Sequence, residues 1–224
     1  MQSTTKQDNQ ASLAAKLQEQ AEKMQTMIPD QTMEVIAKEG NKLASLKLEA
    51  NFPKPGEIAS DFELPSITGK NIKLYDQLKD KNVVLVFYRG GWCPYCSLEL
   101  RAYQAYLEDF KKDGAVLIAI SPELPDKASE TAGKNQLNFE VLYDKASTVA
   151  KKYNLVFKLT DELIEIYKQL GIDVESANGD DSNELPVPAT LVIDRDKTIR
   201  YVFADIDYTK RAEPSEILKV LKQI

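Results

Sequence analysis

The chain has 224 residues, of which 43% are hydrophobic and 29% charged, and it carries a formal net charge of −6. This length is enough for one domain with a substantial core, or for a domain with an appendage. The net negative charge argues against nucleic acid as a partner, because phosphate binding needs a positive surface. No apolar run approaches the ~20 residues of a transmembrane helix, so a membrane-spanning segment is not expected. The first ten residues are polar and show no signal peptide, so a cytoplasmic location is expected.

The chain contains two cysteines and no histidine. Histidine-based acid–base catalysis, a Cys-His dyad and a Ser-His-Asp triad are therefore excluded. A structural zinc ion needs four ligands, so neither a metal nor another cofactor is expected. In a reducing compartment, a closely spaced cysteine pair is typical of redox catalysis or metal binding. A metal cluster shared between two chains and a pair of inert buried cysteines are the alternatives.

Residues 1–50 are predicted to form a helical N-terminal extension. Apolar side chains recur there at steps of three and four residues, which indicates an amphipathic helix that ends at Pro29. A second, weaker helical pattern covers 33–46. The simplest interpretation is an appendage packed on the rest of the chain, residues 51–224. The alternative is an arm through which two copies form a homodimer.

From residue 51 onward, predicted strands and helices alternate. Early alternation indicates parallel strands joined by helical crossovers, and a final hairpin adds an antiparallel edge. The sequence therefore predicts an α/β fold, in which helices flank a mixed central sheet. The expected elements are a hairpin (62–64, 72–74), strands (83–88, 115–120, 139–143, 190–193, 199–204), helices (100–110, 125–136, 146–153, 161–170, 214–221) and a polar loop (178–183).

The motif Trp92–Cys96 lies between the buried strand 83–88 and the following helix. The first turn of a helix offers unpaired N–H groups and a positive dipole end, and both favour a thiolate. A cysteine in this position can have its pKa lowered from about 8.5 to roughly 3.5–7.5. Two intervening residues bring the second sulfur within disulfide reach, and Pro94 suits the first helical turn. Cys93 and Cys96 are therefore the candidate catalytic residues.

The motifs together resemble the peroxiredoxin-like branch of the alkyl hydroperoxide reductase and thiol-specific antioxidant family. The resemblance runs from Pro53 to the C-terminus and implies a thioredoxin-like fold without a cofactor. Residues 1–50 lie outside it. The segments that carry it are Pro55–Phe62, Phe87–Cys96, Leu185–Asp194 and Asp207–Arg211.

The resemblance gives the two cysteines conflicting roles. Thioredoxins carry Trp-Cys-x-x-Cys and use the first cysteine as nucleophile, which implies Cys93. Peroxiredoxins carry Pro-x-x-x-Thr/Ser-x-x-Cys and attack peroxide with the final cysteine of this pattern, which aligns with Cys96. The Thr/Ser of the pattern, whose hydroxyl helps to orient peroxide, aligns with Cys93 in this chain. Their late arginine falls on Pro188, which instead resembles the cis-proline of thioredoxins. The residues expected to shape the site are Arg89 (a positive charge beside the thiolate), Trp92 (a shield), Pro94, Tyr95 (exposed), Val187 and Pro188.

Two enzymatic functions follow from these patterns. In the first, Cys96 reduces a hydroperoxide, Cys93 closes a disulfide, and thioredoxin or a similar dithiol restores both thiols. In the second, Cys93 attacks a protein disulfide and Cys96 resolves the mixed disulfide. A third hypothesis is a non-catalytic thioredoxin-fold binding module or redox sensor.

Overall fold

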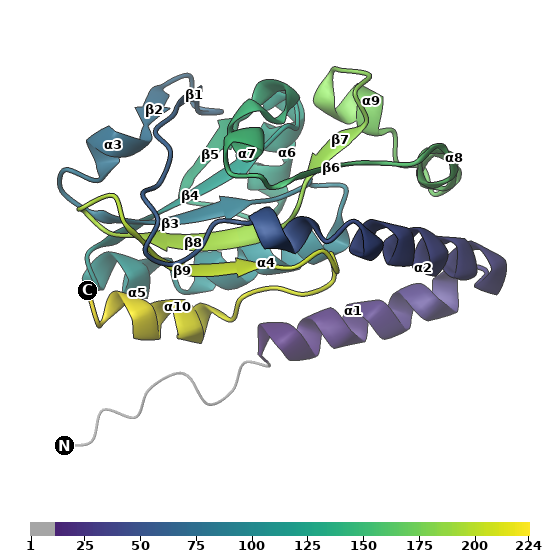
Figure 1. Ribbon diagram of the computed structural model, residues 1–224, viewed down its shortest axis with the longest axis horizontal. Helices are drawn as coiled ribbons and strands as arrows, with labels where there is room; N and C mark the ends of the chain where they lie inside the picture. Colours follow the sequence, from purple (N-terminus) through teal and green to yellow (C-terminus); the bar gives the residue numbers. More distant parts are fainter. Residues whose placement is uncertain (1–11) are drawn as a thin grey trace.

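A five-stranded mixed sheet forms the centre of the molecule (Figure 1). The structure is a computed structural model and describes residues 12–224. The strand order is β5-β4-β3-β8-β9. Strands β3, β4 and β5 are parallel, β8 runs antiparallel to β3, and β9 runs antiparallel to β8. The predicted α/β fold with a mixed sheet is therefore confirmed. The strands are β3 (Asn82–Phe87), β4 (Ala115–Ser121), β5 (Glu140–Tyr143), β8 (Ala189–Ile193) and β9 (Ile199–Ala204).

Strand β3 is buried on both faces, as its continuous β-branched sequence predicts. Because side chains alternate along a strand, Val83 and Leu85 enter one core cluster while Val84 and Val86 enter another. Side chains from α3, α7, α8 and α9 complete the first cluster. Those from α1 (Leu13–Met27), α4, α5, α6 and α10 complete the second. The helices that follow the N-terminal pair are α3 (Leu74–Gln77), α4 (Pro94–Ala105), α5 (Leu107–Lys112), α6 (Pro125–Lys134), α7 (Thr148–Lys152), α8 (Asp161–Gln169), α9 (Val174–Asn178) and α10 (Pro214–Leu221).

Two small antiparallel pairs lie beside the main sheet. The predicted hairpin is present as β1 (Glu63–Pro65) and β2 (Asn71–Lys73). The second pair, β6 (Val156–Lys158) and β7 (Glu184–Pro186), was not predicted, nor was helix α9. The described residues also include two short 3₁₀ turns, Leu48–Asn51 and Lys145–Ser147.

The N-terminal segment forms two helices, α1 (Leu13–Met27) and α2 (Asp30–Ser45), with Pro29 between them as predicted. The first eleven residues of the predicted extension lie outside the described residues. Helix α1 packs on α4 through Leu13 and Leu17, and α2 packs on α8. The boundary between the extension and residues 51–224 stays a prediction. No helix within residues 12–224 combines the length and apolar character needed to span a bilayer.

Candidate active site

The cysteine motif begins where β3 ends. Cys93 has an extended backbone (φ −87°, ψ 114°) and is the N-cap residue of α4, and Pro94 occupies the first helical turn. Cys96 follows three residues later on the same turn, so both cysteines lie at the positive end of the helix. Both are free thiols, and both are fully buried. The polar groups around them therefore determine their chemistry.

Arg89 is the immediate partner of Cys93. Its Nη2 donates to the Cys93 sulfur at 2.9 Å, and its Nη1 donates to the Tyr167 hydroxyl at 2.9 Å. The guanidinium lies 4.3 Å from the ring centroid of Tyr208 and 5.1 Å from that of Trp92. Only 3% of Arg89 is exposed. A buried cation enclosed by aromatic rings interacts more strongly with a nearby anion than an exposed one would.

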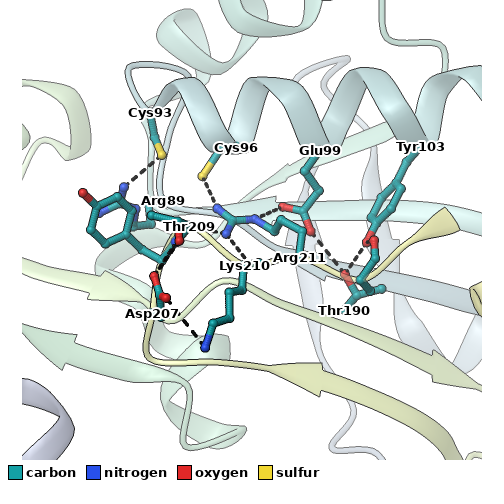
Figure 2. A network of polar contacts seen from close by, with 12 residues as sticks. Arg89, Cys93, Cys96, Glu99, Tyr103, Thr190, Asp207, Thr209, Lys210 and Arg211 are labelled. Carbon is teal, nitrogen blue, oxygen red and sulfur yellow. Dashed lines mark hydrogen bonds and ion pairs between the residues drawn. The ribbon is translucent and has the colours of Figure 1, made fainter. Parts of the chain in front are cut away.

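Arg211 is the partner of Cys96 (Figure 2). Its Nη2 donates to the Cys96 sulfur at 3.3 Å, and its Nε donates to a Glu99 carboxylate oxygen at 2.6 Å. Its Nη1 donates at 2.6 Å to the backbone carbonyls of Tyr208 and Lys210. Four acceptors therefore hold this guanidinium in one orientation.

Glu99 and Tyr103 continue the helix face on which Cys96 lies, because steps of three and four residues repeat on one side of a helix (Figure 2). The Thr190 hydroxyl on β8 lies 3.3 Å from the Glu99 carboxylate and 2.9 Å from the Tyr103 hydroxyl. The Tyr103 hydroxyl also donates to the Ala212 carbonyl. Helix α4, strand β8 and the segment before α10 are thus joined beneath the two sulfurs.

The two thiols have opposite tendencies to ionise. Burial raises the pKa of Cys93, but a hydrogen bond from Cys96 and the charges of Arg89 and Arg211 outweigh it and hold that pKa well below its ordinary value. For Cys96, burial and the neighbouring Cys93 thiolate raise the pKa well above its ordinary value. Burial also raises the pKa of Glu99 to about 7, against the opposing effect of Arg211. The surroundings therefore favour a thiolate on Cys93 and a thiol on Cys96.

Two details expected of the site-shaping residues are wrong. Tyr95 was expected to be exposed, but it is 3% exposed because its ring packs edge-on against Tyr208, with centroids 5.5 Å apart. The cis peptide expected before Pro188 is absent, since residues 12–224 contain only trans peptide bonds. Val187 and Pro188 are both buried and lie directly before β8. Because Ala189 pairs with Phe87, they lie at the end of the sheet where the motif begins.

The backbone before the motif has no room for side chains at Gly90 and Gly91. Gly90 has a positive φ of 152°, and a Cβ there would meet the Trp92 indole. A Cβ on Gly91 would overlap the side chain of Thr131. The Gly91 N–H donates to Glu123 at 3.0 Å, and Thr131 donates to the same carboxylate at 3.2 Å. Both glycines therefore keep the turn into α4 close to α6.

We expect Gly91→Ala to lower the free energy of unfolding by about 1–3 kcal/mol, because the added methyl group overpacks the contact with Thr131. Gly133→Ala is the matched control: it lies in α6 with open space around the added carbon, so it should be neutral or slightly stabilising. Urea unfolding of both variants measures the difference. Equal stability of the two variants would contradict the tight contact.

A cleft of about 590 Å³ borders the motif on its outer side. Gly91 and Trp92 form part of its wall, and charged side chains of α4 and α6, including Arg101 and Lys127, form another part. Neither cysteine lines it. Trp92 lines this cleft and also packs against Arg89 and Tyr167. Its role as a shield of the sulfurs stays a prediction.

Sequence patterns identified the two cysteines and Arg89 but missed Arg211, Glu99 and the tyrosines around Arg89. Arg211 was noticed only as the end of a family-like segment, 115 residues from the cysteine that it contacts. The available signal was Glu99, a carboxylate on the apolar face of a helix between Cys96 and Tyr103. A charge in that position requires a buried partner.

A free cysteine pair at the N-terminus of a helix that follows a central strand, on a mixed sheet, defines the class of thioredoxin-fold thiol proteins. The family model described as "AhpC/TSA family" matches residues 55–202, and the chain belongs to this family.

Relatives and solved structures agree with this assignment. The chain is 30% identical to the peroxiredoxin Bcp of Escherichia coli (strain K12) over 102 residues, which are 46% of this chain and 65% of that protein. It is thus similar over just under two thirds of that relative. It is 29% identical to the chloroplastic peroxiredoxin Q of Triticum aestivum over 82% of this chain and 73% of that one.

Among solved structures, the peroxidoxin BcpB from Mycobacterium tuberculosis is similar with a TM-score of 0.60 at 24% identity, over 76% of this chain and 97% of that chain. The peroxiredoxin-like protein from Aquifex aeolicus has a TM-score of 0.60 at 15% identity, over 77% and 88% of the two chains. At these identities the likeness establishes the thioredoxin-like fold.

Proposed function

We propose that this chain is a thiol peroxidase in which Cys93 attacks a hydroperoxide and Cys96 resolves the product. The observation that carries the proposal is the 2.9 Å contact between the Arg89 guanidinium and the Cys93 sulfur at the N-terminus of α4. A thiolate is the reactive form of cysteine, and these two features favour it at neutral pH. The named peroxiredoxin relatives support the same substrate class.

The proposed cycle has three steps. The Cys93 thiolate attacks one oxygen of the hydroperoxide and the O–O bond breaks, so that Cys93 becomes a sulfenic acid and an alkoxide or hydroxide leaves, which takes a proton from water. The Cys96 thiol then attacks the Cys93 sulfur and releases water, which leaves a Cys93–Cys96 disulfide. An external dithiol of the thioredoxin type reduces this disulfide through a mixed disulfide and is itself oxidised.

The assignment of attack to Cys93 revises the role that the peroxiredoxin pattern gave to Cys96. The pattern places Cys96 where the family has its peroxide-attacking cysteine, but the arginine beside Cys96 also faces the Glu99 carboxylate. Among residues 12–224, no carboxylate forms an ion pair with Arg89, and the sulfur that its guanidinium contacts is that of Cys93. The electrostatic field therefore supports the thioredoxin-like order of attack within a peroxidase.

A thiol–disulfide oxidoreductase is the second candidate, because Cys93 occupies the helix position of a disulfide-attacking cysteine. Full burial of both sulfurs in this reduced state argues against a protein disulfide as the first reactant, since it is far larger than a hydroperoxide. The reductant of the proposed cycle, by contrast, meets the oxidised state. A small oxidant needs only a narrow opening, whereas a protein substrate needs the Cys93 sulfur of the reduced protein at the surface.

The experiment compares peroxide oxidation in the wild type and in Cys96→Ser. Reduced wild type is mixed with hydrogen peroxide, and the reaction is followed through fluorescence of Trp92, the only tryptophan. We expect Cys96→Ser to keep the first, peroxide-dependent phase but to stop at a sulfenic acid. Dimedone should then trap this acid on Cys93, as located by mass spectrometry, while turnover with thioredoxin is lost.

Cys93→Ser is the matched variant and should lose the first phase. A dimedone adduct on Cys96 that forms at the wild-type rate would return the attacking role to Cys96. If hydrogen peroxide oxidises neither cysteine while a small disulfide reacts rapidly with Cys93, the second candidate function replaces the first.

A homodimer through the N-terminal helices is a further part of the proposal. It is supported by Met27 at the end of α1 and Leu46 after α2, which are 68% and 64% exposed. Light scattering of the reduced protein and of a Met27→Glu/Leu46→Glu variant tests it: a dimer for the first and a monomer for the second are expected. A monomeric wild type would remove the dimer from the proposal.

A further inference from the structure

Two guanidinium groups lie within hydrogen-bond distance of the two sulfurs, yet their surroundings differ. Arg89 contacts one sulfur, one hydroxyl and two aromatic rings, all of them neutral except the thiolate. Arg211 contacts the other sulfur but forms a 2.6 Å ion pair with Glu99, and both side chains are at most 1% exposed. The positive charge of Arg89 is therefore free to stabilise a thiolate on Cys93, whereas the positive charge of Arg211 beside Cys96 is already neutralised by Glu99.

Counting the buried charges gives the same result. Within residues 12–224, the charged groups that contact the two sulfurs are two buried cations, Arg89 and Arg211, and Arg211 pairs with one buried carboxylate, Glu99 (Figure 2). The other buried carboxyl group near the motif, Glu123, accepts from Gly91 and Thr131 and contacts neither cation. Burial of an unbalanced charge is costly, so one further negative charge is required for balance. A single thiolate supplies it. The position of the carboxylate decides which of the two sulfurs carries that charge.

We infer that Glu99 is a positioning residue that neutralises Arg211 and thereby assigns attack to Cys93 and resolution to Cys96. This inference rests on the proposed function, because it explains the order of the two sulfurs within that cycle. Glu99 acts through Arg211, and the ion pair and hydrogen bonds of its carboxylate do not include either sulfur. If the carboxylate lost its charge, the Arg211 guanidinium would attract a negative charge to Cys96.

A purely structural role is the alternative to this inference. The pair of Glu99 and Arg211 joins α4 to the segment before α10, so it also anchors that segment. Glu99→Gln separates the two roles, because glutamine keeps the length of the side chain and an oxygen that accepts from Arg211 but carries no charge. A structural role predicts little change in thiol ionisation, whereas a charge-balancing role predicts a large one.

The test is a pH titration by NMR of protein labelled with carbon-13 at the cysteine Cβ atoms. The chain has two cysteines, so two signals report each thiol directly and need no reagent to reach the buried sulfurs. We expect Glu99→Gln to increase the acid dissociation constant of the Cys96 thiol by about tenfold or more. Tyr103→Phe, which removes the hydroxyl beside Thr190 and changes no charge, is the control and should titrate as the wild type does.

The pH dependence provides a second readout. The titratable or charged groups around Glu99 are Arg211, Cys96 and Tyr103, and those that act on Cys96 also include Cys93, Arg89 and Glu123, which are the same in both proteins. Burial raises the pKa of Glu99 to about 7. Above this pH wild type and Glu99→Gln should differ at Cys96. Well below it, where Glu99 is protonated in the wild type, their Cys96 signals should coincide. A structural role predicts no difference at Cys96 above this pH either.

The double variant Glu99→Gln/Arg211→Gln removes both charges of the pair and should return the Cys96 titration toward that of the wild type. An unchanged Cys96 titration in folded Glu99→Gln, or no return in the double variant, overturns the inference. Neither result affects the proposed peroxidase function, because the peroxide experiment asks only whether hydrogen peroxide oxidises Cys93. If wild-type Cys93 is not oxidised by hydrogen peroxide while the Cys96 titration shifts in Glu99→Gln, the proposed function alone is overturned.

Discussion

Arg89→Met should react with hydrogen peroxide at least about 100-fold more slowly than the wild type at neutral pH. Burial opposes ionisation of Cys93, and the charge of Arg89 at 2.9 Å is one of the interactions that overcome it. Methionine keeps a long side chain between the rings of Trp92 and Tyr208 but supplies no charge. The Cys93 thiol should therefore stay protonated. Peroxide consumption, measured in solution rather than through Trp92, reports the rate.

The pH profile separates this explanation from misfolding. Because the wild-type pKa of Cys93 is lowered, its rate should be flat around neutrality and fall only in acid. In Arg89→Met the pKa is raised, so the rate should climb as pH increases through the alkaline range. Arg101→Met is the matched control, since Arg101 is an exposed arginine on α4 that bonds to Asn135, and it should keep the wild-type rate. A flat and low profile for Arg89→Met would contradict the electrostatic role.

The second large effect concerns stability. Arg211→Met should lower the free energy of unfolding by about 3–5 kcal/mol, because it leaves the Glu99 carboxylate buried without its partner. It also removes the donors to the Tyr208 and Lys210 carbonyls. Urea unfolding of the reduced protein at pH 8 measures the loss. Lys111→Met breaks the exposed pair with Glu108 and should cost at most about 1 kcal/mol.

Acidification should relieve much of this loss. A carboxyl whose folded pKa is raised stabilises the fold below its unfolded pKa, and that contribution disappears as pH rises through the folded pKa. With Arg211 absent, the opposing effect on Glu99 is gone, so protonation of Glu99 should restore stability toward pH 5. A loss of equal size at pH 5 and pH 8 would mean that the carbonyl contacts, and not the carboxylate, are responsible.

Regular elements with strong patterns were predictable, and short ones were not. The β-branched run of β3 and the apolar periodicity of α10 indicated both elements closely, because each buries a continuous face. The pair of β6 and β7 has three residues in each strand, which is too short for any period to emerge. Helix α9 has five residues in a polar stretch, where an Asp173 cap and not an apolar face begins the helix.

The candidate site was predictable where it depends on neighbours in the sequence. Cys93 at a strand-to-helix junction follows from local pattern, and so does the placement of Pro94. The contact of Arg211 with Glu99 does not, because 112 residues separate them and a loop carries the arginine. The exposure of Tyr95 was misjudged for the same reason, since Tyr208 on that loop covers it.

The enclosure of Arg89 has a consequence for the energetics of the catalytic cycle. Closing a disulfide ordinarily stabilises a protein by restricting its unfolded chain. Here disulfide formation would remove the negative charge of the Cys93 thiolate, the one anion that contacts Arg89 within residues 12–224. The Arg89 guanidinium would then remain buried among aromatic rings without a negative partner. Oxidation should thus destabilise the folded chain through this unpaired buried charge, and reduction of the disulfide should remove the destabilisation. The protein would rest in its dithiol form, and its reductant would act on a disulfide that the surroundings already disfavour.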